Sequence, residues 1–238
     1  YHSADPSRVP VAAMVKNGEE ALRLAVIFPP RGGQHNQWYQ CNKCQLALHT
    51  VDATHHQCPK CEHVYTGEPY DDVVFGHVHS KNLKHLHAAA WAYAVTEDTR
   101  FADFARQVLL GYAERYQQYP LHAASRGQSA GEKISGGHLF EQTLNEAASL
   151  ANWIAPAYDL IHDAPCMTTG DHERIRTGLL LPMLQNIAKN KAGKSNWQTW
   201  HNAGMLWGGA VLRDTAWVTQ AIEDPRNGFL QQMKISVT

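Results

Sequence analysis

Two cysteine pairs constrain the fold of this chain more than any other feature of its sequence. They read Cys41-Asn42-Lys43-Cys44 and Cys58-Pro59-Lys60-Cys61, with 13 residues between them. Two Cys-x-x-Cys turns at this spacing let four thiolates converge on one ion, and four soft thiolates in a tetrahedral array suit Zn²⁺ in a closed structural site. The spacing therefore predicts a structural zinc site made of Cys41, Cys44, Cys58 and Cys61.

The residues around the cysteines predict a small zinc-ribbon-like unit over residues 37–70. Aromatic and β-branched residues flank both pairs, which favours two short hairpins that hold the ion. Two disulfides are the alternative, because an exported protein would permit them. A nearby histidine could also replace one cysteine ligand; the candidates are His49, His55, His56 and His63. A redox Cys-x-x-Cys motif is expected as a single pair at the start of a helix, so the two pairs argue against a redox function. Cys166 is assigned no role.

The overall composition excludes several classes of protein. The chain has 238 residues, of which 44% are hydrophobic and 18% charged, as in ordinary globular proteins. The sequence contains no run of about 18 apolar residues, which is the length that a helix needs to cross a bilayer. A formal net charge of −1 argues against a nucleic-acid partner. The chain starts without Met or a signal-peptide pattern, and residues 234–238 are strand-like, so we expect it to be a piece of a longer protein.

From about residue 78 onward, apolar residues recur at helical spacing and strand signals nearly vanish. Asp98 is a candidate cap for the second helix of a hairpin. The pattern predicts an all-α array of helical hairpins. The expected helices are 18–25, a helix from about 78 that ends at 96–98, a helix after Asp98 with apolar positions from 101 to 112, 139–162, a helix from 169 with apolar positions to 187, 198–213 and 215–222. The expected divisions are an N-terminal segment (1–36), the ribbon (37–70) and the helical array (71–238).

Two groups of polar residues stand apart from the apolar stripes. One face of the helix expected at 139–162 carries mostly amides; its members are Gln142, Asn145, Glu146, Ser149 and Asn152. Such a row is either a solvated helix face or a set of hydrogen-bonding groups for carbohydrate hydroxyls. The pattern alone leaves both readings open.

The second group, residues 195–205, places two Trp, one His, two Asn and one Gln at the start of a predicted helix. Gln198 and Asn202 are four residues apart and so align on one side. In a purely structural reading, Ser195 or Asn196 caps the helix, the tryptophans belong to the core, and His201 bonds to the backbone. In the other reading, the rings and amides form a pyranose-binding site, because sugar faces stack on aromatic rings.

The order of these motifs resembles the N-terminal half of the heparinase II/III-like polysaccharide lyases, which include alginate-lyase relatives. The resemblance covers roughly residues 78–238. It rests on Thr96-Glu97-Asp98, on the segments 138–147 and 157–161, and above all on Ser195-Asn196-Trp197-Gln198-Thr199-Trp200-His201-Asn202-Ala203. The resemblance implies an incomplete (α/α) toroid followed by a C-terminal β-sandwich domain. The ribbon is similar to an insertion before the helices of some members.

The chemistry that the resemblance implies is β-elimination at a uronic acid. Removal of the C5 proton requires the neighbouring carboxylate to be neutralised. By position, Asn202 would neutralise it and His201 would assist or abstract the proton, although the two roles can be exchanged. A Tyr acid or base would lie after this chain, so we expect the chain alone to be inactive. By analogy, the groove would be lined by Gln142, Asn145, Glu146, Gln198, Trp200 and Arg126.

We therefore expect a secreted or periplasmic polysaccharide lyase that acts on an anionic polysaccharide and carries structural zinc. Two other functions are left open. One is a non-catalytic carbohydrate-binding toroid, and the other is a zinc-ribbon interaction module.

Overall fold

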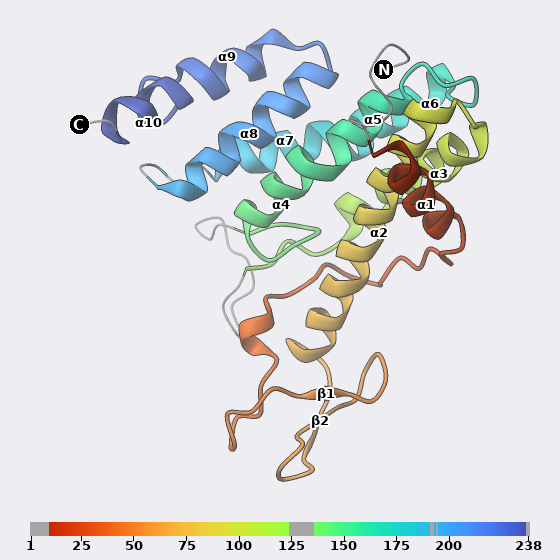
Figure 1. Ribbon diagram of the computed structural model, residues 1–238. Coiled ribbons are helices and arrows are strands. Elements are labelled where there is room, and N and C mark those ends of the chain that lie inside the picture. Colours follow the sequence, from red (N-terminus) through yellow and green to blue (C-terminus); the bar gives the residue numbers. More distant parts are fainter. Residues whose placement is uncertain (1–9, 124–135, 191–192, 194, 237–238) are drawn as a thin grey trace.

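The computed structural model describes residues 10–123, 136–190, 193 and 195–236, and most of these residues are helical (Figure 1). The long helix α2 (Tyr70–Thr96) contacts α1 (Val11–Leu22), α3 (Thr99–Arg115) and α5 (Ala155–Ile161). A second group forms around α8 (Asn196–Val211), which packs on α4 (Thr143–Ser149), α7 (Leu181–Lys189) and α9 (Thr215–Glu223). The predicted helix-rich class is confirmed.

The hairpin of α2 and α3 forms as the sequence predicts. Glu97 adopts a left-handed conformation (φ 58°) that ends α2, and the Asp98 side chain accepts a hydrogen bond from the main-chain N–H of Arg100. This capping satisfies one of the free donors of the first turn of α3. The tight connection lets α3 fold back along α2.

Two of the predicted long helices each contain a π-helical turn before a proline. In the first, η3 (Leu150–Ile154) lies between α4 and α5, and Pro156 follows it. In the second, η4 (Arg176–Leu180) joins α6 (Thr169–Ile175) to α7, and Pro182 follows it. A proline inside an α-helix lacks its N–H and collides with the carbonyl four residues earlier. The wider π turn relieves this conflict, so each helix continues past its proline.

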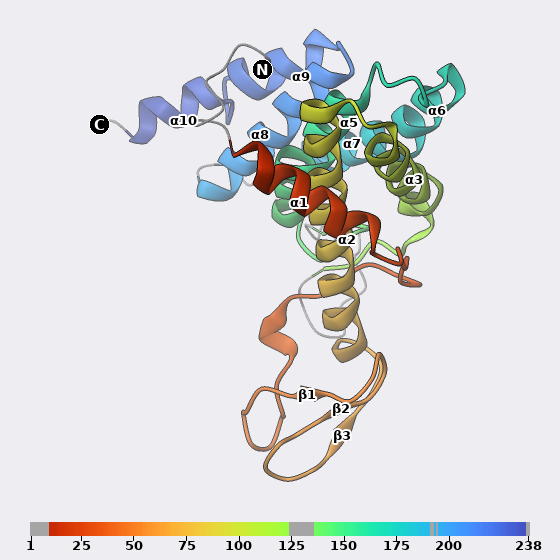
Figure 2. The ribbon, with the colours of Figure 1, turned by 45° about the vertical axis from the view of Figure 1, so that its right-hand side comes forward.

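The ribbon extends from the N-terminal end of α2, away from the helical body (Figure 2). It contains the short helix η1 (Asn36–Trp38) and the strands β1 (His49–Thr50), β2 (His56–Gln57) and β3 (Val64–Tyr65). The strands form one antiparallel sheet in the order β1-β2-β3, with Thr50 opposite His56 and His56 opposite Tyr65. Each cysteine pair lies in a short antiparallel loop, as predicted: the first loop is closed by the bridge between Gln40 and Ala47, and the second connects β2 to β3.

Several boundaries differ from the prediction. The first helix is α1 at Val11–Leu22 and not 18–25, and the helical pattern begins at Tyr70 and not at residue 78. The strand predicted near the end is wrong for residues 234–236, because they belong to the helix α10 (Phe229–Ser236); residues 237 and 238 lie outside the described residues. A short η2 (Tyr116–Gln118) follows α3. Among the described residues, none of the helices combines the length and the apolarity that crossing a membrane requires.

The hydrophobic core divides into two unequal parts. One continuous core joins the helices from α1 to α9, with Tyr112, Tyr116 and Ile154 among its fully buried side chains. The ribbon has only a small cluster, made of Cys41, Leu48, Cys58 and Tyr70. The helical body can thus be stable through apolar burial, whereas the ribbon needs another source of stability.

Candidate active site and metal centre

The four cysteines of the two pairs come together at one point of the ribbon. Their Sγ atoms all lie within 4.8 Å of one another, and those of Cys41 and Cys61 are 3.7 Å apart. A tetrahedral site with Zn–S bonds of about 2.3 Å separates its sulfurs by about 3.8 Å. A disulfide requires about 2.05 Å, and all five cysteines are free thiols. The donor set therefore fits one tetrahedral metal ion.

The surroundings of the thiols favour the thiolate form at two of the four positions. A hydrogen bond from the Tyr65 hydroxyl lowers the pKa of Cys41 to about 6, and the main-chain N–H of Cys61 lowers the pKa of Cys58. Burial instead raises the pKa of Cys44 to about 12. Because a metal binds the thiolate, Cys44 must lose its proton when an ion binds.

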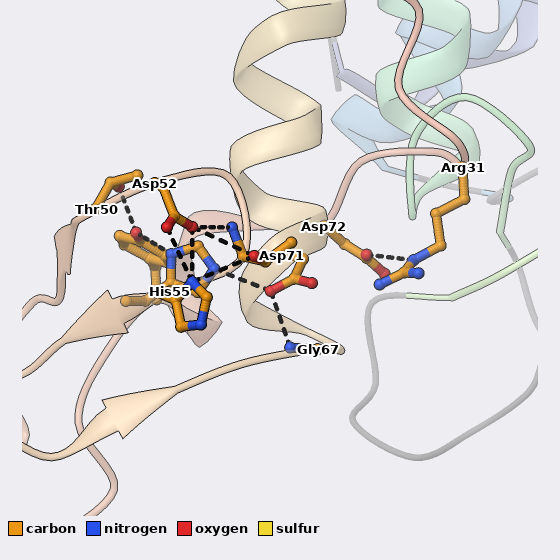
Figure 3. Close-up of polar contacts among 10 residues, drawn as sticks. Arg31, Thr50, Asp52, His55, Gly67, Asp71 and Asp72 are labelled. Atoms are coloured by element: carbon orange, nitrogen blue, oxygen red, sulfur yellow. Dashed lines mark hydrogen bonds and ion pairs between the residues drawn. The ribbon is translucent and has the colours of Figure 1, made fainter.

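Two of the candidate histidines of the ribbon, His55 and His56, are held by other groups. His56 is fully buried, with Nδ1 2.7 Å from the Tyr39 hydroxyl and Nε2 3.0 Å from Asp71 Oδ1. His55 Nδ1 contacts the Asp52 carboxylate at 2.9 Å (Figure 3). Over the described residues, the four cysteines are the one group of three or more side chains that could hold a metal. The structure thus supports cysteine ligation.

At the start of α8, the predicted site residues split between two faces. Gln198, His201 and Asn202 are buried, whereas Trp200 lies on the outer face and is 40% exposed. The predicted alignment of Gln198 and Asn202 is confirmed, because Gln198 Nε2 donates to Asn202 Oδ1 at 2.8 Å. Asn202 Nδ2 donates in turn to the main-chain oxygen of Asn227 at 2.9 Å. Trp200 therefore does not share the face of the amides.

Three members of the polar row expected on the helix at 139–162 lie at the start of α4: Gln142, Asn145 and Glu146. Gln142 precedes α4 as its N-cap residue and is half-buried. Asn145 is also half-buried and donates to Glu141 Oε1 at 2.9 Å. Glu146 is fully buried and accepts hydrogen bonds from the Tyr116 hydroxyl, from Leu139 N at 2.6 Å and from Asn186 Nδ2 at 3.2 Å. Glu146 thus anchors the segment before α4 from inside, and Gln142 and Asn145 stay partly accessible.

Helices α4 and α8 lie side by side and run in the same direction. A Cβ atom on Gly204 would lie 3.0 Å from the main-chain oxygen of Ala147, and one on Gly208 would meet Leu150 at 3.2 Å. This close approach places both N-terminal ends, with their amides, at the same end of the helical body, which is also the end that carries the ribbon (Figure 1). The two helices that carry the predicted polar groups therefore pack directly against each other. Arg126 lies outside the described residues.

Sequence reasoning missed several polar residues at this end. Glu141 is buried, and burial raises the pKa of its carboxyl. Arg31 pairs with the buried Asp72, with Nε and Oδ1 2.5 Å apart. His122 Nε2 donates to the main-chain oxygen of Gly33 at 2.7 Å. Glu141 could have been found from the sequence, because it lies four residues before Asn145 and so at helical spacing from it. The contacts of Arg31 and His122 join segments that are far apart in the sequence.

Comparisons with known proteins identify similar sequences. No family model matches the chain. An alginate lyase of Stenotrophomonas maltophilia (strain K279a) is 33% identical over 164 residues, which cover 66% of this chain and 21% of that protein. An exo-oligoalginate lyase of Saccharophagus degradans is 32% identical over 140 residues, which cover 59% of this chain and 17% of that protein. The chain spans about a fifth of the length of these relatives, and its similarity to them supports a relationship to the polysaccharide lyases.

Proposed function

We propose that this chain is part of a heparinase II/III-like polysaccharide lyase that cleaves a uronic-acid-containing polysaccharide by β-elimination. The observation that carries the proposal is the similarity to two proteins named as alginate lyases. The arrangement of the helices is compatible with the first part of an (α/α) toroid, which a C-terminal β-sandwich domain would follow in the full protein. Secretion or export to the periplasm fits a polymer that is degraded outside the cytoplasm.

The site of this activity would be the end of the body where α4 and α8 begin. In this proposal, Asn202 neutralises the uronate carboxylate, so that negative charge can develop when the C5 proton leaves. His201 next to it assists or accepts the proton. Gln142, Asn145 and Gln198 would orient sugar hydroxyls through their amides, and Arg126 would contribute a cation. Trp200 could stack only on a sugar that reaches the outer face of α8.

The ribbon would hold Zn²⁺ as a structural ion. Cys41, Cys44, Cys58 and Cys61 would supply all four ligands, and a closed four-thiolate site leaves no position for substrate. The ion would therefore contribute to folding and not to the elimination step.

A mutant pair on α8 tests the proposed reaction. The full-length polypeptide that carries this chain is mixed with alginate and other uronans, and the absorbance of unsaturated uronate products is followed. Asn202→Ala should lower kcat by about 10²–10³-fold, the usual loss for one stabilising donor. Asn196→Ala is the matched control, since Asn196 is an exposed amide on the same helix, and it should retain activity. Absence of product across the uronan panel would refute the lyase function.

A non-catalytic carbohydrate-binding role is the second candidate. It is favoured by the side chain of Asn202, whose oxygen and nitrogen bond to Gln198 and to Asn227 inside the body. Calorimetric binding of alginate oligosaccharides by a polypeptide that forms no product would support this role over catalysis.

A further inference from the structure

The ribbon is attached to the body at the first turn of α2. Asn42, which lies between two of the cysteines, donates through Nδ2 to the Tyr70 hydroxyl at 3.1 Å. His56 of the central strand reaches Asp71 Oδ1 at 3.0 Å in a fully buried contact. The ring of Tyr65 lies 4.7 Å from that of Tyr70. These contacts come from separate parts of the ribbon, so all of them require the ribbon to be folded.

The same turn of α2 holds a second segment, residues 31–35, which we call the strap. Asp72 points away from Asp71, toward Arg31 (Figure 3), and forms the 2.5 Å ion pair with it. The main-chain oxygen of Asp72 also accepts a hydrogen bond from Gln34 N at 2.8 Å. One turn later in α2, Gly76 lies very close to Gly33: a Cβ atom added to Gly33 would be 2.3 Å from the Cα of Gly76. The position of the strap is therefore set by the start of α2.

The strap in turn holds the residues that lead to the proposed site. Gly33 N donates to the main-chain oxygen of Leu139 at 2.9 Å, and Gly33 pairs with Phe140 in a parallel bridge. His122 donates to the oxygen of Gly33, and Gln34 Nε2 donates to the oxygen of Ala123 at 3.0 Å. Phe140 directly precedes Glu141 and Gln142. A chain of contacts thus runs from the ribbon through α2 and the strap to the start of α4.

The first part of this chain of contacts depends on the metal. The strands of the ribbon are two residues long, and two of the four residues in its buried cluster are cysteines. A unit of this size does not stay folded through apolar burial alone, and binding a structural metal supplies the missing free energy.

We propose that the metal-loaded ribbon positions the proposed substrate site. With the ion bound, the ribbon holds the first turn of α2 through His56 and Asn42, and α2 holds the strap. The strap then fixes residues 119–123 and 136–142 beside the start of α4. His56 acts as a positioning residue, because its contacts join the ribbon to Asp71 and it touches no substrate. We call this chain of contacts, from the ribbon through α2 and the strap to the start of α4, the relay. Its significance for catalysis rests on the proposed function, but the existence of the relay does not.

Hydrogen exchange measured by mass spectrometry on the whole 238-residue chain tests the relay without any substrate. The chain is compared in its zinc-loaded form and after removal of zinc by a chelator. Loss of zinc should increase exchange in residues 37–70 and also, by about tenfold or more, in peptides from 119–123 and 136–142. Peptides from α6, which packs on α3 and η4, should keep their protection.

His56→Gln breaks the relay while keeping the four cysteines, and His55→Gln is the matched control on the adjacent exposed histidine. His56→Gln should retain one zinc per chain by elemental analysis, yet show the faster exchange at 119–123 and 136–142. His55→Gln should behave like the unchanged chain. Exchange changes confined to 37–70, on chelation and in His56→Gln, would overturn the proposal. A failed lyase assay would leave this result unaffected, so the two proposals fail separately.

Discussion

The ribbon and the helical body of this protein obtain their stability in different ways. The body buries a continuous apolar core that extends through nine helices, from α1 to α9. The ribbon buries four residues around a cluster of thiols and has strands of two residues. Loss of one bound metal ion should therefore unfold the ribbon, whereas unfolding the body should require several core substitutions.

Loss of the metal should have the largest effect of any single change. Cys41→Ser removes one of four thiolates and should abolish tight zinc binding, which in zinc-finger peptides supplies about 10–16 kcal/mol of folding free energy. Elemental analysis should find no bound zinc, and limited proteolysis should cut within 37–70. Cys166→Ser is the control, since Cys166 lies in the body, and it should keep the zinc. A protease-resistant ribbon in Cys41→Ser would contradict this view.

A core substitution should affect the body and spare the metal. Ile154 is fully buried, so Ile154→Ala should lower the free energy of unfolding by about 2–5 kcal/mol through lost burial and a cavity. Urea unfolding followed by circular dichroism measures this. Leu206→Ala, at a position that is 38% exposed, should cost about 0.5 kcal/mol or less. Equal losses in the two variants, or zinc loss in Ile154→Ala, would argue against two independent sources of stability.

The body should also lose stability in acid through Asp171. The side chain of Arg106, 2.9 Å away, and the hydrogen bonds from Thr168 lower the pKa of Asp171 to about 2. The folded state thus favours the carboxylate, which contributes about 1–2 kcal/mol above the unfolded pKa of about 4. This contribution should disappear as the pH falls from about 5 to about 2.

Urea titrations of the unchanged chain and Asp171→Asn over this pH range check the prediction. The difference in unfolding free energy between them should be constant near neutral pH and shrink in acid. Glu173→Gln, which alters an exposed carboxylate on the same helix, should show little difference at any pH. A constant difference for Asp171→Asn down to pH 2 would disprove the assignment.

The smallest effect is expected where the two regions meet. Asn42→Ala removes the hydrogen bond to Tyr70 and should cost about 0.5–1.5 kcal/mol, with zinc content unchanged. Exchange of the amide protons around Tyr70 provides the measurement. Lys43→Ala, at the next exposed position, should have no such effect. A similar change in both variants would mean that the Asn42 contact does not join the regions.

Local features of the fold could be predicted from the sequence because their causes lie within a few residues. The Asp98 cap depends on the next two residues, and the Gln198–Asn202 contact depends on helical spacing alone. The C-terminal helix α10 was missed because its last residues, Lys234-Ile235-Ser236, have the alternation of a strand. A pattern this short does not distinguish helix from strand without the packing around it.

The candidate site was only partly predictable. Its amides were found because they repeat at helical spacing, but spacing does not reveal which neighbour will cover a side chain. Glu146 is enclosed by Tyr116 and Asn186 from two other helices. Trp200 faces outward because the inner face of α8 is already filled by its packing on α4 and α7.

The four-cysteine cluster, the helical class and the hairpin of α2 and α3 could be predicted because their physical causes are local. Tertiary packing sets the contact of the strap with Leu139 and Phe140 before α4, and the bond of Asn202 to Asn227 inside the body. The reason is that each Cys-x-x-Cys turn and each helix cap is formed by a few consecutive residues. Burial and long-range hydrogen bonds are set by segments that meet only after the chain has folded.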